Sequence, residues 1–314
     1  GREKMEAVMS FADQAIYTDY PRLQLVRAIF HVKEGKLDQA VSAWEAARSI
    51  SQGFEKDRPG GNDTALKEES RILEFLFAAY GCRRLEDQVA TSQSLLVETP
   101  SADHGDMFAG VVYTLMCLNS LQNGNFGDAM RQADLSEKAF EKAGSDYGIL
   151  FLDFHRAGVA LGQAEFEKAE WYLKRAMRRQ RRHFPSDAGL RSICQIFHAE
   201  IDLERGRLKT ARRRLKNVSR HLRAGEAWFD IYASAIRSES YLDYLLNGID
   251  AAEEGLQTSR MIGAERGLTR VERLVDTVRL ELACLAGRRG KSNEMSERLS
   301  LSEVFDDPDR MKFV

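Results

Sequence analysis

The chain has 314 residues, of which 43% are hydrophobic and 30% are charged, and its net charge is -2. These values are typical of a folded globular protein, and the near-neutral total argues against nucleic-acid binding through overall charge. Only five residues are prolines, which interrupt helices, whereas the good helix formers Ala, Leu, Glu, Arg and Lys are frequent, so long helices are expected.

From the N-terminus onward, small turn residues recur inside the same local pattern. The clearest of these anchor residues are Gly35, Gly124, Ala164, Gly206 and Asn247. Seven residues before each anchor the side chain is small: Ala28, Cys117, Ala157, Ala199 and Ser240. Five residues after each anchor stands an alanine: Ala40, Ala129, Ala169, Ala211 and Ala252. Nine residues after each anchor the side chain is again apolar: Trp44, Ala133, Leu173, Leu215 and Leu256.

This pattern predicts a helix, a tight turn and a second helix in each copy. Positions two, five, nine and twelve after the anchor lie on one stripe of a helix, and small residues on both helices let an antiparallel pair pack closely. Weaker copies are anchored near Leu85 and Gly290, and from Leu85 onward the anchors are 39–43 residues apart. We therefore predict an all-α fold, a right-handed superhelical solenoid of about seven tetratricopeptide-like helix-turn-helix units of ~40 residues each, as one domain over residues 2–314.

Three short stretches lie outside or between these units. The segment QGFEKDRPGGNDT (52–64) is polar and contains Gly and Pro, so we predict a loop insertion there. The acidic residues 303–314 are predicted to be a tail or linker. The motif GRRGKS (287–292) has only two residues between its glycines, where a phosphate-binding loop needs four, and we interpret it as a turn between helices. Gly1 is interpreted as a cleavage scar and is left out of the fold prediction.

Two of the copies carry a resemblance to a known family. They are AGVALGQAEFEKAEWYLKRAM (157–177) and AEIDLERGRLKTARRRL (199–215). Both resemble the repeat region of MalT-like regulators, which are large, ATP-dependent, LuxR-type bacterial transcription activators, although the period is longer than the about 34 residues of the standard tetratricopeptide repeat.

In the MalT-like family the repeats lie between a nucleotide-binding module and a C-terminal helix-turn-helix, and the sequence contains the pattern of neither. The resemblance therefore implies an excised, cytoplasmic sensor segment. It would bind an effector or a partner protein and would communicate with those two modules, without direct sequence-specific DNA binding of its own. The alternative is a stand-alone scaffold that binds a peptide or a protein.

The first helix of each unit is expected to line the inner wall of the solenoid. In the tetratricopeptide frame the wall positions lie ten, six and three residues before the anchor. Applied to units four, five and six, with one further position a turn earlier, this frame contains six candidate ligand-binding residues: Phe151, Phe154, Glu200, Arg237, Tyr241 and Tyr244. Aromatic rings beside one carboxylate and one guanidinium suit a sugar, a small amphipathic metabolite or a peptide. The alternative is that the aromatic rings only pack between units.

A strongly basic stretch covers residues 174–223, with sixteen Lys and Arg against four acidic residues and a local charge of +12. The candidates for contact with an anionic partner lie on the second helices of units four and five. They are Arg175, Arg178, Arg179, Arg182, Arg212, Arg213 and Lys216. Such a partner could be the DNA backbone, an acidic module of the full-length protein or polymerase. The alternative is a solvated face that is balanced by acids on neighbouring helices. The acids concerned are Asp134, Glu137, Glu141, Glu253 and Glu254.

Sequence patterns of catalysis and metal binding are missing. The six histidines have no metal-ligand spacing, and no obvious base stands beside any of the four cysteines, so we expect no enzyme, no cofactor and no metal. The cysteines are expected to be small buried residues in a reducing compartment: Cys82, Cys117, Cys194 and Cys284. No apolar run approaches the ~20 residues that a membrane span needs.

Overall fold

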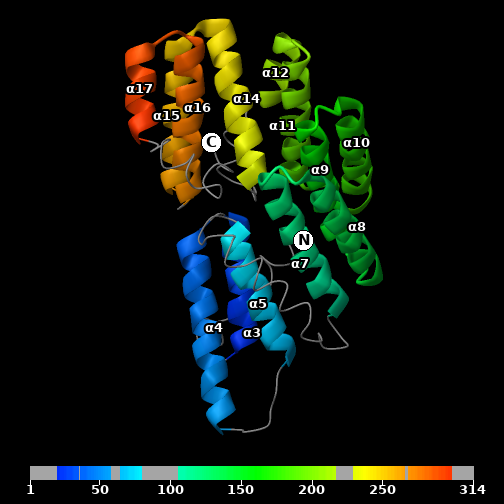
Figure 1. The fold of residues 1–314 in the computed structure, drawn as a ribbon. Coiled ribbons are helices and arrows are strands. Elements are labelled where there is room, and N and C mark those ends of the chain that lie inside the picture. The colour runs from blue at the N-terminus through cyan, green and yellow to red at the C-terminus, as the bar shows by residue number, and fades with distance from the viewer. Residues whose placement is uncertain are drawn as a thin grey trace.

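A computed structural model describes residues 20–34, 36–57, 64–79, 105–216, 229–265 and 268–298. Within these ranges every regular element is an α-helix (Figure 1). The helices are α3 (Pro21–Glu34), α4 (Leu37–Asp57), α5 (Thr64–Ala79), α7 (Gly105–Gln122), α8 (Phe126–Lys142), α9 (Asp146–Gly162), α10 (Phe166–His183), α11 (Ala188–Glu204), α12 (Leu208–Leu215), α14 (Phe229–Asn247), α15 (Ile249–Glu265), α16 (Thr269–Leu285) and α17 (Arg289–Arg298).

Consecutive helices pack as antiparallel pairs. In the described ranges these pairs are α3–α4, α7–α8, α9–α10, α11–α12, α14–α15 and α16–α17 (Figure 1). We call the first helix of each pair helix A and the second helix B. From α7 onward each helix A also contacts the helix A of the following pair, whereas α3 and α7 each contact α5. The prediction of an all-α chain built from paired helices is therefore confirmed, and the arrangement is consistent with an α-helical repeat.

The small residues of the sequence pattern lie where the two helices of a pair meet. The five alanines that follow the anchors are fully buried, and so are the small residues that precede the first four anchors. The α7–α8 contact illustrates how close the two helices come. Thr114 and Ser136 both donate a side-chain hydrogen bond to the carbonyl oxygen of Gly110, at 2.9 and 2.7 Å. Larger side chains at these positions would separate the helices, because interiors are close-packed.

The turns between helices A and B use residues with a positive φ angle. Gly124, Ala164 and Gly206 have φ angles of 70°, 57° and 69°, which is the left-handed conformation that commonly ends a helix. The predicted anchors at Asn247 and Gly290 are wrong by one and three residues. The left-handed turn residues there are Gly248 and Gly287, because glycine adopts a positive φ without a steric cost.

Asn247 is the last residue of α14, and Gly290 lies inside α17. The interpretation of GRRGKS as a turn is confirmed for its first residues, since Gly287 ends the turn after α16 and α17 begins at Arg289. This placement matters for the candidate site, because the frame that selects wall residues is counted back from the turn.

The predicted loop at 52–64 is wrong for its first six residues. Helix α4 continues through them and ends at Asp57, two residues before Pro59. Helix α4 contains no proline that would interrupt it. A proline disfavours helical geometry at the residue before it, so a helix end shortly before Pro59 is expected. Residues 58–63, the anchor near Leu85 with the second helix predicted after it, and the tail at 303–314 lie outside the described residues.

Candidate functional site

The neighbouring A helices α11 and α14 carry four of the six predicted ligand-binding residues, and α16 packs beside α14. Polar side chains from these helices meet in two groups. We call the five residues of the two groups the A-helix wall: Glu200 from α11, Ser234, Arg237 and Tyr241 from α14, and Glu281 from α16. The wall exists because α14 contacts α11 on one side and α16 on the other.

The first group joins α11 to α14. The hydroxyl of Ser234 donates a hydrogen bond of 2.5 Å to the Glu200 carboxylate. Burial raises the pKa of Glu200 above its ordinary value, and the bond from Ser234 and the positive charge of Arg237 offset part of that effect. A carboxyl group with a raised pKa ionises less readily.

The second group joins α14 to α16 through one carboxylate. Nη1 of Arg237 lies 3.1 Å from Oε1 of Glu281, and the hydroxyl of Tyr241 donates to Oε2 at 2.9 Å. Burial raises the pKa of Tyr241 to about 12, with a further contribution from the negative charge of Glu281. Tyr241 therefore stays protonated at neutral pH and acts as a donor. The Arg237 side chain remains 47% exposed.

Glu281 was missed by the sequence analysis because the wall frame was applied only to units four, five and six, and the last unit was in addition anchored three residues too late. Counted back from Gly287, Glu281 stands six residues before the turn. Glu200 holds the same position relative to its anchor Gly206, and Tyr241 holds it relative to the predicted anchor Asn247. The signal for this residue was present in the frame, but it depended on choosing the correct glycine.

The remaining predicted groove residues lie elsewhere. Tyr244 is half-buried and packs against the core. The rings of Phe151 and Phe154 are buried, 4% and 0% exposed, and pack edge to face with centroids 5.9 Å apart. Neither ring faces an open surface. Both phenylalanines therefore fit the alternative in which the aromatic rings only pack between units. Their role is to fill the space between α9 and its neighbours.

His155 adds a polar contact inside the same packed region. It is fully buried on α9, and its Nδ1 lies 3.1 Å from Oδ2 of Asp230 on α14. This contact connects two A helices that are separated in sequence by the α11–α12 pair. It therefore stabilises the arrangement of helices behind the wall.

The basic surface divides into two parts. On α10, Arg175 pairs with Asp153 and with Glu137, whose Oε1 lies 2.8 Å from Nη2, and Arg179 pairs with Asp146. Of the acids named for the proposed balance only Glu137 pairs with these two cations, whereas Asp153 and Asp146 are residues of α9 that the sequence analysis did not name. Arg178 and Arg182 lie exposed on the same helix.

A buried ionic network lies beneath this part of the surface. Nη1 and Nη2 of Arg156 donate to Glu137 and Asp134, both at 2.6 Å. Asp153 is fully buried and pairs with Arg175, while burial raises the pKa of its carboxyl. The network joins α8, α9 and α10, so these charges stabilise the stacking of two pairs.

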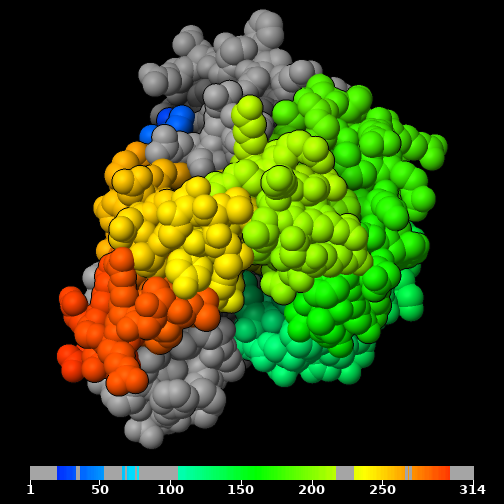
Figure 2. All heavy atoms as spheres, turned by 90° about the horizontal axis from the view of Figure 1, so that it is seen from above, coloured from blue at the N-terminus to red at the C-terminus, as the bar shows by residue number. Residues whose placement is uncertain are grey.

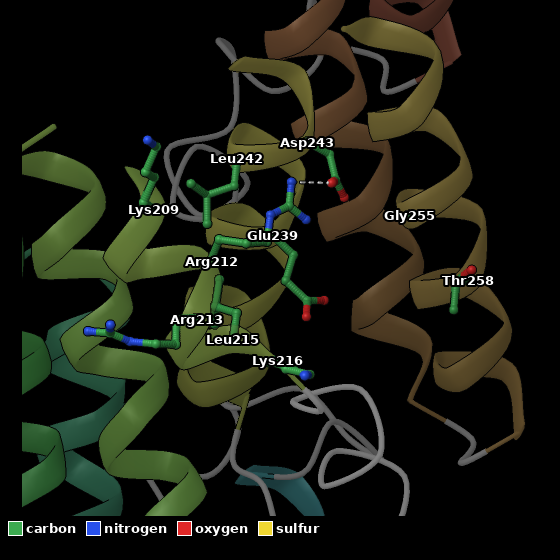
Figure 3. A pocket seen from close by; sticks show the side chains of 10 residues that line it. All are labelled: Lys209, Arg212, Arg213, Leu215, Lys216, Glu239, Leu242, Asp243, Gly255 and Thr258. Carbon is green, nitrogen blue, oxygen red and sulfur yellow. Dashed lines mark ion pairs between the residues drawn. The ribbon is translucent and has the colours of Figure 1, made fainter. Parts of the chain in front are cut away.

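The second part of the basic surface borders a cleft between α12, α14 and α15 (Figure 3). We call this space, with a volume of about 590 Å³, the basic cleft. Arg212, Arg213 and Lys216 line it together with Lys209, which the sequence analysis did not select. Figure 2 shows the atoms of α12, in yellow-green, directly beside those of α14, in yellow.

The described cysteines differ in their surroundings. Burial raises the pKa of the Cys117 and Cys194 thiols to about 12, whereas Cys284 is exposed near the end of α16. Thiolates rather than thiols are nucleophilic, so the two buried cysteines are unsuited to covalent catalysis. Within the described ranges, His, Cys, Asp and Glu form no group of three or more that could hold a metal ion.

These surroundings predict the pattern of cysteine alkylation. With iodoacetamide at mildly alkaline pH, Cys284 is expected to react in the folded chain, whereas Cys117 and Cys194 react only after unfolding, because their thiols are buried and protonated. Peptide mass spectrometry after short labelling measures each site separately. Equal labelling of Cys117 and Cys284 without denaturant would contradict the burial of Cys117.

Comparison of the chain with protein-family models, curated proteins and solved structures finds no match. Over the ranges that the structure describes, no helix combines the length and the apolar character needed to cross a membrane.

Proposed function

We propose that the chain is an effector- or partner-sensing helical-repeat segment of a bacterial transcription regulator of the MalT-like kind. In this proposal the paired helices belong to a right-handed superhelical solenoid of about seven units, and the ligand binds on the A-helix wall. The observation that carries the proposal is the pair of polar groups that connects α11 to α14 and α14 to α16.

The wall offers groups that a ligand can engage directly. A guanidinium has five N–H donors, and Arg237 uses one of them at 3.1 Å while it stays half-exposed. A carboxylate or hydroxyl of a ligand can therefore bind Arg237, with the ring of Tyr241 beside it for apolar surface. Glu200 supplies a second orienting group on the adjacent helix.

The same contacts give a physical route from binding to signalling. Glu281 holds α16 to α14 through Arg237 and Tyr241. A ligand that replaces Glu281 as the acceptor weakens the link between the two helices, and it favours an arrangement in which they are placed differently. A ligand shifts such an equilibrium by its difference in affinity for the two arrangements.

A ligand screen with Arg237→Gln tests the site. We expect a sugar, a short peptide or a nucleotide that binds the wall to stabilise the wild-type chain by about 2.7 kcal/mol at 100 times its dissociation constant. The variant should lose most of this gain, because it removes the charged donor. Thermal-shift assays measure it, with Arg273→Gln on the exposed face of α16 as the control. A ligand that stabilises Arg237→Gln and the wild-type chain equally does not bind the wall.

A scaffold function is the second candidate, and exposed leucines favour it. Leu245 and Leu246 at the end of α14 and Leu285 at the end of α16 are large, exposed and apolar. These ends lie at the same side of the molecule (Figure 1), and exposed apolar patches are typical of protein-binding surfaces. The native reading frame separates the two functions. Continuation past Val314 into a helix-turn-helix supports the regulator, and its absence supports the scaffold.

A further inference from the structure

The basic cleft is a hollow on the side of α14 that faces α12 and α15. Leu215 and Leu242 are buried residues among those that line it, and Gly255 and Thr258 contribute from α15 (Figure 3). A volume of about 590 Å³ lies within the range of small-molecule sites, about 300–1,000 Å³. The cleft is therefore of a size to enclose a small ligand rather than to accommodate only a flat macromolecular surface.

The charges around the cleft are unequal. Four cations from α12 and its C-terminal end line the cleft with two acids from α14, Glu239 and Asp243. Because the guanidinium of Arg213 is directed away from the cleft (Figure 3), the other three cations and the two acids leave a net charge of +1. Nη2 of Arg212 lies 2.7 Å from Oδ1 of Asp243. This pair neutralises the acid that would otherwise repel an anion. Figure 3 shows Arg212 directed toward Asp243 and the guanidinium of Arg213 directed away from the cleft.

Lys209 and Lys216 are the cations available to a ligand. Both are exposed, and in the part of the chain that the structure describes no carboxylate lies within ion-pair distance of either. They stand seven residues apart, which corresponds to about 10 Å along a helix. A small ion cannot contact both ammonium groups, whereas an extended ligand with an anionic group can bind one lysine and approach the second.

The position of these cations at the end of α12 has an ordinary explanation as well. Basic residues at a helix C-terminus interact favourably with the helix dipole, and α10 also ends in basic residues. The dipole accounts for the type of residue but not for the hollow of about 590 Å³ beside the charges.

We propose that the basic cleft binds a phosphate-bearing small molecule of sugar-phosphate or nucleotide size. One of the two ammonium groups of Lys209 and Lys216 holds the phosphate as a point charge, and the body of the ligand extends toward the other. The Thr258 hydroxyl, which donates to the carbonyl oxygen of Glu254 at 3.1 Å, accepts a hydrogen bond from the ligand. This site is separate from the A-helix wall, since none of its lining residues belongs to the wall.

Calorimetric titration tests the proposal with named probes at low salt. The probes are glucose 6-phosphate and AMP, with glucose and adenosine as uncharged counterparts and inorganic phosphate as the bare ion. We expect at least one phosphate ester to bind and its uncharged counterpart not to bind. The variant Lys209→Gln with Lys216→Gln should weaken this binding by about tenfold or more, because each charge-assisted hydrogen bond contributes about 1.5–3 kcal/mol.

A second double variant controls for overall charge. Lys138→Gln with Lys174→Gln makes the same change in net charge at exposed positions of α8 and α10, and it should leave the dissociation constant unchanged within about twofold. Circular dichroism confirms that both double variants are folded. An equal loss in the two variants would overturn the proposal. So would binding of a DNA duplex, or of inorganic phosphate alone, without binding of either ester. Failure of the Arg237→Gln test leaves this result unaffected, since Arg237 lies outside the cleft.

Discussion

Replacement of Arg156 by methionine is expected to destabilise the folded chain by about 3–5 kcal/mol. The Arg156 side chain is only 3% exposed and pairs with both Glu137 and Asp134. Methionine retains much of the aliphatic packing but removes the charge. Arg175 would then have to balance the carboxylates of Glu137 and Asp153 alone, and a buried charge without its partner costs several kcal/mol.

Urea denaturation followed by circular dichroism measures this loss as a lower midpoint at an unchanged slope. The control is Arg178→Met on α10, which removes the same charge from an exposed position. It should change the free energy of unfolding by no more than about 0.5 kcal/mol. If Arg156→Met unfolded at the wild-type urea concentration, the network would be irrelevant to stability.

The Gly110→Ala variant is expected to lose about 1–3 kcal/mol of stability, although alanine is the better helix former by about 1 kcal/mol. A Cβ atom at position 110 would lie 2.5 and 2.6 Å from two carbons of the Phe140 ring. The ring cannot simply withdraw, because Gly148 faces it as well, and a Cβ there would lie 2.7 Å away. Phe140 is therefore enclosed by glycines from α7 and α9.

The matched control for this substitution is Gly127→Ala in α8, where an added Cβ meets no atom within 4 Å. This variant should be neutral or gain up to about 1 kcal/mol, because only the helix propensity changes. Thermal or urea unfolding of the two variants should therefore give opposite signs. A stabilising effect at both positions would mean that the α7–α8–α9 packing adapts without cost.

The paired helices could be predicted from the sequence because the pattern reports directly on packing. Small residues recur where helices A and B touch, and the turn residues at 124, 164 and 206 were placed correctly. The turn at Gly287 could not be chosen with the same rule, since Gly290 is an equally small residue three positions later. The turn residue is the glycine that takes a positive φ angle. Which of the two glycines does so depends on where packing against neighbouring helices ends α16.

The candidate site was predictable only in part. Counting from Gly206 and from the predicted anchor Asn247, one residue before the turn glycine, selected Glu200, Arg237 and Tyr241, which lie on neighbouring helices. The same count selected Phe154, which the packing encloses completely. A sequence periodicity shows that a residue faces the next helix, but it does not show whether a third helix covers it. For the same reason the pairing of Arg175 with acids on α8 and α9 was one of two open alternatives.

The charged contacts between helices also restrict the order in which the helical hairpins can assemble. Hairpins with similar apolar faces can exchange neighbours and become trapped in misassembled forms. Arg156 on α9 pairs with Glu137 on α8, and Arg175 on α10 pairs with Asp153 on α9. In contrast, Nε of Arg279 on α16 lies 2.7 Å from Glu253 on α15. A hairpin docked beside the wrong neighbour would leave a guanidinium buried without a carboxylate. At these junctions the ion pairs thus favour the native neighbour over another hairpin with a similar apolar face.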